Sequence, residues 1–253
     1  MTKQLDKRVA IVTGASSGLG KAIAESFAAE GAKTVLAARR KDVLEDVAAG
    51  IRKTGGEALV VATDVSREED VVALFAQVTK AYGRVDIVVN NAGVPTSTPT
   101  EDVTLKYWNE VLAVNLTGPF LMSREAIKVM KAQTPQGGRI INIGSVSAKT
   151  PRPDSMGYTV TKFAMQGMTH QLTMDGRKYG VVSSVIHPGA TLSGFTARRG
   201  RTKAGAGETP QDYVMAAEDV ARVAVLMCGL PPEVNLFEAT ILPNQMRSFI
   251  SRG

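Results

Sequence analysis

Short apolar runs alternate along the chain with longer segments of helical periodicity. The apolar runs are rich in β-branched residues, and most are continuous rather than alternating in polarity. Continuous apolar strands are typical of a parallel sheet, because its strands are buried on both faces. We therefore predict strands at residues 9–13, 34–38, 58–62, 85–89, 139–143, 181–186 and 236–242.

Helices are predicted between these strands, at residues 20–30, 43–54, 68–82, 105–132, 158–179 and 218–228. Most of them are followed by a glycine, which often ends a helix in a left-handed conformation: Gly31, Gly55, Gly83, Gly137 and Gly180. Repeated strand–helix units with right-handed crossovers build a doubly wound α/β sheet. We expect a Rossmann domain with a mostly or fully parallel seven-stranded sheet.

Residues 193–213 interrupt this alternation. The segment is rich in glycine and charge, and we expect a mobile loop over the carboxyl edge of the sheet, where α/β proteins bind their ligands. No segment has the composition of a linker between domains. Residues 1–253 are therefore predicted to form a single domain.

Composition narrows the class of protein further. One cysteine, Cys228, and two histidines exclude an internal disulfide framework and a structural zinc site. No apolar run is long enough to span a bilayer, and the start lacks the apolar core of a signal peptide, so we expect a cytoplasmic protein. Thirty Lys and Arg against 24 Asp and Glu give a formal net charge of +6. Such a charge suits nucleic acid, acidic membranes or anionic small molecules, or it is spread over a solvated surface.

A glycine-rich turn follows the first predicted strand. Gly14, Gly18 and Gly20 come directly after Val9–Thr13 and open the next helix. Glycines let the chain turn tightly and approach a pyrophosphate, and the N–H groups at the helix start bind that anion. The position between a strand and a helix is the context that a dinucleotide site requires. A plain turn without a ligand is the alternative.

The spacing of these glycines, TGASSGLG at residues 13–20, resembles the signature of the short-chain dehydrogenase/reductase family. The resemblance continues in order through NNAG at residues 90–93, Asn115, Ser145, Tyr158 with Lys162, and Pro-Gly at residues 188–189. It implies an oxidoreductase that transfers hydride between a nicotinamide cofactor and a carbonyl or secondary alcohol. No metal is expected.

The end of the second strand points to NADP as that cofactor. NAD proteins usually carry an acidic residue there, which binds the ribose 2′-hydroxyl. This chain has Ala38, followed by Arg39 and Arg40, and a guanidinium can bind the 2′-phosphate of NADP through two hydrogen bonds. Ser17 stands where some NADP-dependent members carry a basic residue. The alternative is that residues 39–41 are a solvated charge run.

The resemblance also implies the remaining cofactor contacts. Asp64 and Val65 flank the adenine, although the alternative for Asp64 is an N-cap of the next helix. Asn90, Ala92 and Gly93 line the nicotinamide side. The full set of implied contacts is Gly14, Ser16, Ser17, Gly18, Leu19, Gly20, Arg39, Arg40, Asp64, Val65, Asn91, Ala92, Gly93, Tyr158, Lys162, Pro188, Gly189 and Thr191. Ser193 is the alternative to Thr191.

Tyr158 and Lys162 are four residues apart and therefore share one face of a helix. A free phenol, with a pKa of about 10, is a poor catalyst at neutral pH, and a neighbouring ammonium favours the phenolate. The resemblance implies that Tyr158 is the general acid/base and that Ser145 binds the substrate oxygen. It further implies that Lys162 binds the ribose and that Asn115 holds a water.

Basic residues gather after Ser145 and in the 193–213 segment: Lys149, Arg152, Arg198, Arg199, Arg201 and Lys203. One hypothesis is that they bind an anionic substrate, such as a carboxylic acid or an acyl group on a phosphopantetheine carrier, with 3-oxoacyl thioester reduction as an alternative specific activity. The other is that they belong to an ordinary solvated lid.

Other function classes fit less well. An NADP-sensing protein without turnover would not need Ser145, Tyr158 and Lys162 together. Nucleic-acid binding lacks a motif, and aromatic residues make up only 5% of the chain. By resemblance we expect a homodimer or homotetramer with no nucleic-acid or membrane partner. We interpret His187 as a packed residue at a strand end.

Overall fold

The computed structural model describes residues 3–192, 214–244 and 246. Its strands form one parallel sheet in the order β3-β2-β1-β4-β5-β6-β7, which confirms the predicted Rossmann fold. The strand order reverses between β1 and β4, so a crevice for ligands is expected at their carboxyl ends. The strands are β1 Val9–Thr13, β2 Lys33–Ala38, β3 Glu57–Ala62, β4 Ile87–Asn90, β5 Gly138–Ile143, β6 Val181–Pro188 and β7 Glu238–Ile241.

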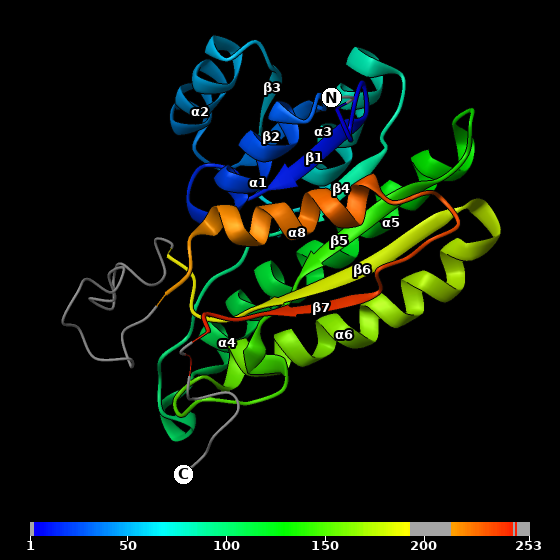
Figure 1. Cartoon of the computed structure of the whole chain (residues 1–253). Coiled ribbons are helices and arrows are strands. Elements are labelled where there is room, and N and C mark those ends of the chain that lie inside the picture. The colour runs from blue at the N-terminus through cyan, green and yellow to red at the C-terminus, as the bar shows by residue number, and fades with distance from the viewer. Residues whose placement is uncertain (1–2, 193–213, 245, 247–253) are drawn as a thin grey trace.

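Helices cover both faces of the sheet (Figure 1). On one face α1, α2 and α8 pack around a buried core, and on the other α3, α5 and α6 pack around a second one. Strand β1 serves both cores, because Ala10 and Val12 enter the first while Val9 and Ile11 enter the second. The helices are α1 Gly18–Ala29, α2 Lys41–Lys53, α3 Glu68–Tyr82, α4 Leu105–Leu112, α5 Gly118–Ala132, α6 Met156–Gly176 and α8 Ala217–Gly229.

Residues 105–132 are helical throughout, as predicted, but the segment contains a π-helical turn. This turn, Ala113–Thr117, lies between α4 and α5. Pro119 explains the turn, because proline has no N–H to donate to the carbonyl of Asn115 four residues earlier. A proline inside a helical pattern is a signal for such an irregularity.

Two predicted strands begin later than expected, β4 at Ile87 and β7 at Glu238. The main chain of Val85 binds the side chain of Gln133. The Gln133 carboxamide accepts from the Val85 N–H and donates to the Val85 oxygen, each at 3.0 Å. Before β7, Asn235 donates from its carboxamide to the Ser183 oxygen at 3.0 Å.

Candidate active site

The turn between β1 and α1 brings the chain close to itself. Gly14 and Gly18 adopt left-handed φ angles of +66° and +55°. A Cβ on Gly14 would lie 2.8 Å from the Asn91 side-chain nitrogen, and one on Gly20 would collide with the Gly14 carbonyl. The turn is therefore a cradle that other side chains would fill. Ser17, the N-cap of α1, makes no capping hydrogen bond with its side chain, so the first N–H groups of α1 can bind an anion.

Thr13 ties the end of β1 to the loop that follows β4. Its hydroxyl accepts from the N–H groups of Asn91 and Ala92, both at 3.0 Å, and donates to the Val89 oxygen. The Asn91 carboxamide returns a hydrogen bond to the Thr13 oxygen at 2.8 Å. The Asn91 side chain therefore positions the glycine turn, while Ala92 and Gly93 lie half-buried beside it.

Asn90 faces the core. Its side chain donates to Ser123 Oγ at 3.0 Å and to Asn142 Oδ1 at 2.8 Å, and only 2% of the residue is exposed. The prediction that Asn90 lines the nicotinamide side is therefore wrong for its side chain. Buried polar groups of this kind normally find partners within the protein.

Arg39 and Asp64 follow the ends of β2 and β3. Asp64 Oδ1 accepts from the N–H of Ser66 at 3.0 Å and from its hydroxyl at 2.6 Å. Partial burial opposes ionisation, but these hydrogen bonds and the charges of Arg39 and Arg67 outweigh it, and the pKa of Asp64 lies below its usual value. Since Arg67 is the N-cap of α3, the alternative of Asp64 as that N-cap is wrong.

Lys162 joins α6 to the end of β5. Its ammonium donates to the Ile143 oxygen at 2.6 Å, and its Nζ lies 5.4 Å from the ring centre of Tyr158. Only 5% of Lys162 is exposed. Burial lowers the pKa of Lys162 to about 8, because desolvation disfavours the charged form. The ammonium thus lies between the Tyr158 ring and the strand that leads to Ser145.

Ser145 caps the short 3-10 helix Val146–Ala148. Its Oγ accepts from the N–H of Ser147 at 3.1 Å, which leaves the hydroxyl hydrogen able to donate to another oxygen. Ser145 is buried, and Tyr158 is half-buried. The loop after β5 and the first turns of α6 therefore bring a hydroxyl, a phenol and an ammonium to one edge of the sheet.

Asn115 lies in the π-helical turn and is buried. Its carboxamide accepts from the N–H of Val94 at 2.8 Å and donates to the Val94 oxygen at 2.9 Å. It also reaches Thr161 Oγ1 on α6, at 3.4 Å. The side chain of Asn115 is thus occupied, whereas its main-chain carbonyl lacks the usual helical donor at Pro119.

Pro188 and Gly189 end β6 at the same edge. Gly189 donates from its N–H to Ile241 of β7 at 2.8 Å, and Thr191 donates from its hydroxyl to the Gly189 oxygen at 3.0 Å. Thr191 pairs with Met215 in an isolated bridge. The alternative Ser193, the loop at residues 193–213 and the basic residues from Arg198 to Lys203 lie outside the described residues.

Comparison with known proteins identifies the family. A family model described as short chain dehydrogenase matches residues 8–204. The chain belongs to the short-chain dehydrogenase family. One relative of this short-chain dehydrogenase is a 3beta-hydroxysteroid dehydrogenase of Mediterraneibacter gnavus, 34% identical over 77% of this chain and 70% of the relative.

Two solved structures resemble this short-chain dehydrogenase over nearly its whole length. A 3-ketoacyl-(acyl-carrier-protein) reductase from Brucella melitensis, complexed with NADH, is 29% identical with a TM-score of 0.84, covering 95% of this chain and 99% of the other. A metagenomic short-chain oxidoreductase in complex with NADP is 31% identical with a TM-score of 0.81, covering 95% and 99%.

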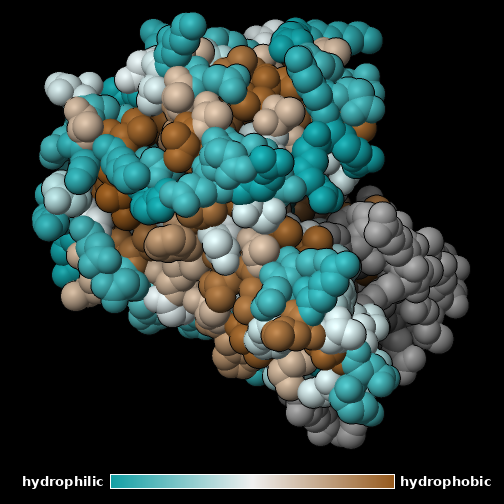
Figure 2. All heavy atoms as spheres, turned by 180° about the vertical axis from the view of Figure 1, so that it is seen from behind, coloured by the Kyte–Doolittle hydropathy of each residue, from teal (hydrophilic) through white to brown (hydrophobic). Residues whose placement is uncertain are grey.

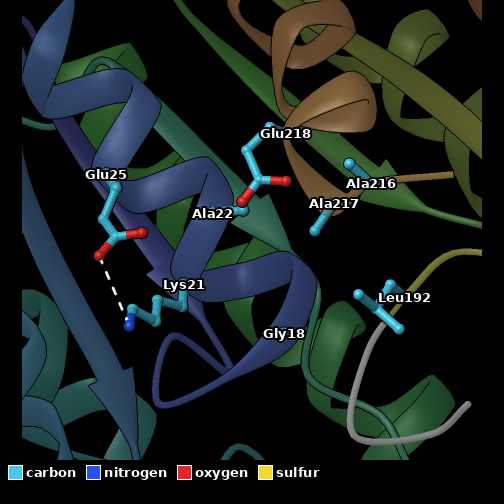
Figure 3. A pocket seen from close by; sticks show the side chains of 8 residues that line it. All are labelled: Gly18, Lys21, Ala22, Glu25, Leu192, Ala216, Ala217 and Glu218. Atoms are coloured by element: carbon cyan, nitrogen blue, oxygen red, sulfur yellow. Dashed lines mark ion pairs between the residues drawn. The ribbon is translucent and has the colours of Figure 1, made fainter. Parts of the chain in front are cut away.

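A hollow of about 310 Å³ lies between the first turns of α1 and α8 in this short-chain dehydrogenase (Figure 3). Gly18 and Leu192 border it, and Lys21 pairs with Glu25 on its rim at 3.7 Å. It adjoins the glycine turn but contains neither Ser145, Tyr158 nor Lys162.

Metal ligands and membrane spans are both missing from the described part of the chain. Over residues 3–192, 214–244 and 246, no cluster of three or more His, Cys, Asp or Glu side chains could hold a metal. None of the helices in those ranges is long and apolar enough to cross a bilayer.

Proposed function

We propose that this short-chain dehydrogenase interconverts a carbonyl and a secondary alcohol with NADP(H), using Tyr158 as the general acid/base. The observation that carries the proposal is the bond from Lys162 to Ile143. It fixes α6, which bears Tyr158, against the strand end that leads to Ser145. A hydroxyl donor, a phenol and an ammonium at one strand edge suit proton transfer to an oxygen.

The glycine cradle supports a dinucleotide as the cofactor. A side chain at Gly14 or Gly20 would collide with neighbouring atoms, so this turn favours glycine at both positions. The start of α1 offers its N–H groups to a pyrophosphate. We propose that the contacts implied by the resemblance hold this cofactor, with Asn91 acting by positioning the turn. When bound, the nicotinamide supplies or accepts the hydride.

The chain's own residues then handle the substrate oxygen. Tyr158 donates a proton to the carbonyl oxygen in reduction and removes it in oxidation. Ser145 donates its hydroxyl hydrogen to the same oxygen and holds it near Tyr158. Lys162, whose pKa of about 8 keeps it mostly charged at pH 7, favours the ionised phenol. The main-chain carbonyl of Asn115 is the proposed acceptor for the water that returns the proton.

The preference for NADP rests on the residues after β2. Ala38 brings no carboxylate against a 2′-phosphate, and exposed Arg39 and Arg40 can bind one. Asp64, whose pKa the charge of Arg39 helps to lower, already accepts two hydrogen bonds from Ser66. Fluorescence titration should show tighter binding of NADPH than of NADH, and equal or tighter NADH binding would overturn the preference.

The substrate class is proposed more narrowly as an anionic carbonyl compound, with a 3-oxoacyl thioester as the specific candidate. Lys149, one of the basic residues on which this substrate class rests, is a weaker candidate for binding an anion, because it forms an ion pair with Glu238. Rising salt should lower activity on acidic ketones if cations bind the substrate. Unchanged activity would favour an uncharged carbonyl compound.

Turnover by wild-type protein and by Tyr158→Phe tests the function directly. NADPH oxidation should be measured against ketones, aldehydes, 3-oxoacyl thioesters and sugars. Tyr158→Phe should lower kcat by about a hundredfold or more, the range of general acid–base catalysis, with NADPH binding retained. Tyr179→Phe, which changes a tyrosine after α6, is the matched control. Wild-type NADPH binding without any turnover would favour the sensing protein instead.

Assembly is proposed as a homodimer or homotetramer of single-domain chains in the cytoplasm. Hydrophobic residues reach the surface among polar ones (Figure 2). On α4, α5 and α6 the exposed large apolar side chains are Leu105, Phe120, Met156, Val160, Phe163 and Met174. Such faces favour association, and light scattering after gel filtration would measure the mass.

A further inference from the structure

A buried imidazole contacts the main chain of Ser145. His187, on β6, has no exposed surface. Its Nδ1 lies 3.3 Å from the Ser145 nitrogen and 3.0 Å from the Ser145 oxygen. The first residue after β5 leaves space for the ring, because a Cβ on Gly144 would lie 2.5 Å from this Nδ1. The absence of a side chain at Gly144 therefore allows the contact.

The other ring nitrogen faces a carboxylate. His187 Nε2 is buried without a hydrogen-bond partner among the described residues, and it lies 3.9 Å from Glu238 Oε1. Glu238 is held in place by Lys149 and by Gln166, whose Nε2 donates to Oε2 at 2.9 Å. A line of contacts thus leads from Ser145 through His187 to an ion pair at the β7 edge.

Burial opposes a charge on this imidazole and lowers the pKa of His187, although the Ser145 oxygen and Glu238 act the other way and Lys149 and Lys162 add to the lowering. The ring is therefore neutral at pH 7 and carries one proton. With that proton on Nδ1, the ring donates to the Ser145 oxygen at 3.0 Å, the shorter of the two main-chain contacts. With the proton on Nε2, Nδ1 would accept from the Ser145 N–H at 3.3 Å, but its lone pair would then face that oxygen. Glu238 Oε1, 3.9 Å from Nε2, is too far away for a hydrogen bond.

We propose that His187 is a positioning residue, which fixes the main chain of Ser145 by donating from Nδ1–H to the Ser145 oxygen. The proposal rests on the proposed function of Ser145. Ser145 must hold the substrate oxygen near Tyr158, and small displacements of a positioned group lower turnover strongly. His187 itself touches neither substrate nor cofactor in this role.

Two substitutions separate the hydrogen bond from packing. Asparagine can place an amide atom near the position of Nδ1, whereas leucine cannot form the bond. His187→Leu should lower kcat at least tenfold with the Kd of NADPH within twofold, and His187→Asn should restore kcat to within threefold of wild type. Equal losses in both variants, or no loss in His187→Leu, would overturn the positioning role.

The tautomer can be measured without turnover. The chain has only two histidines, so a long-range ¹H–¹⁵N spectrum of ¹⁵N-histidine-labelled protein resolves both rings, and His170→Gln assigns them. The His187 ring should carry its proton on Nδ1 in the wild type. A proton on Nε2 in the wild type would overturn the donation to the Ser145 oxygen.

These readouts also separate this proposal from the proposed function. A wild-type protein that turns over no carbonyl compound would overturn the proposed function. The tautomer spectrum would still support or overturn the His187 contact, even where His187→Leu fails to fold.

Discussion

The ammonium of Lys162 lies 2.6 Å from the main-chain oxygen of Ile143, and only 5% of the lysine is exposed. This bond holds α6 against the end of β5. Burial is the cause that lowers the pKa of Lys162 to about 8. The charge that we propose assists Tyr158 is therefore costly to the folded protein when no cofactor is bound, because an ammonium loses hydration there.

Replacing Lys162 by Met should raise the melting temperature of the ligand-free protein at pH 7 and remove most turnover. A pKa lowered from 10.5 to about 8 corresponds to a cost of about 3 kcal/mol, part of which the lost bond to Ile143 offsets. The unfolded chain keeps this proton up to about pH 10.5, so the cost is complete below pH 8 and fades toward pH 10.5.

Scanning fluorimetry of wild type and Lys162→Met at pH 7 and pH 10 checks this. The stabilisation should be larger at pH 7. A gain that is equal or larger at pH 10 would contradict the assignment of the cost to a buried charge.

Gly20→Ala should destabilise the protein and weaken NADPH binding. A Cβ at this position would collide with the Gly14 carbonyl and the Asn91 side chain, and overpacking of this kind costs about 1–3 kcal/mol. Gly50→Ala is the matched control, because nothing lies within 4 Å of a Cβ there. In the middle of α2 the alanine should stabilise by up to about 1 kcal/mol. Urea unfolding measures both, and the same sign for the two variants would refute this account of the turn.

Ala38→Asp should reverse the cofactor preference. The new carboxylate would repel a 2′-phosphate and could accept from the ribose 2′-hydroxyl of NADH. Arg39→Ala should weaken NADPH binding about tenfold, because the loss of one charge-assisted hydrogen bond to the 2′-phosphate changes the dissociation constant by roughly that factor. NADH binding should stay nearly unchanged. Lys41→Ala serves as the control for general charge. Equal losses for both cofactors in Arg39→Ala would show that Arg39 does not bind the phosphate.

Cys228 should not react with a thiol reagent in the folded protein. Burial raises the pKa of its thiol to about 12, and the thiolate is the reactive form. The chain has a single cysteine, so colour formed with Ellman's reagent at pH 8 reports Cys228 alone. We expect reaction only after urea is added. Rapid reaction without urea would mean that the α8 face opens readily.

Several local features of the site could be predicted from neighbouring residues. The glycine spacing, the Tyr158–Lys162 pair and the neighbours Ala38 and Arg39 each lie within one element or turn. There the spacing of residues along the chain sets how their side chains lie relative to one another. Pro119 also carried a local signal for the π-helical turn, although the periodicity around it predicted one helix. Asp64 was ambiguous, because an aspartate before a helix can cap it or, as with Ser66 here, close a turn of its own.

The sequence by itself determined the Rossmann fold, the family signature and the residues expected to carry the chemistry. Local pattern suffices there, since apolar periodicity and turn glycines act over a few neighbours. The tertiary structure alone decided that Asn90 faces the core, that Lys149 pairs with Glu238, and that His187 contacts Ser145. The packing of strands and of the loops after them sets these partners, because it brings together residues 42 to 89 positions apart, and no local pattern encodes that packing.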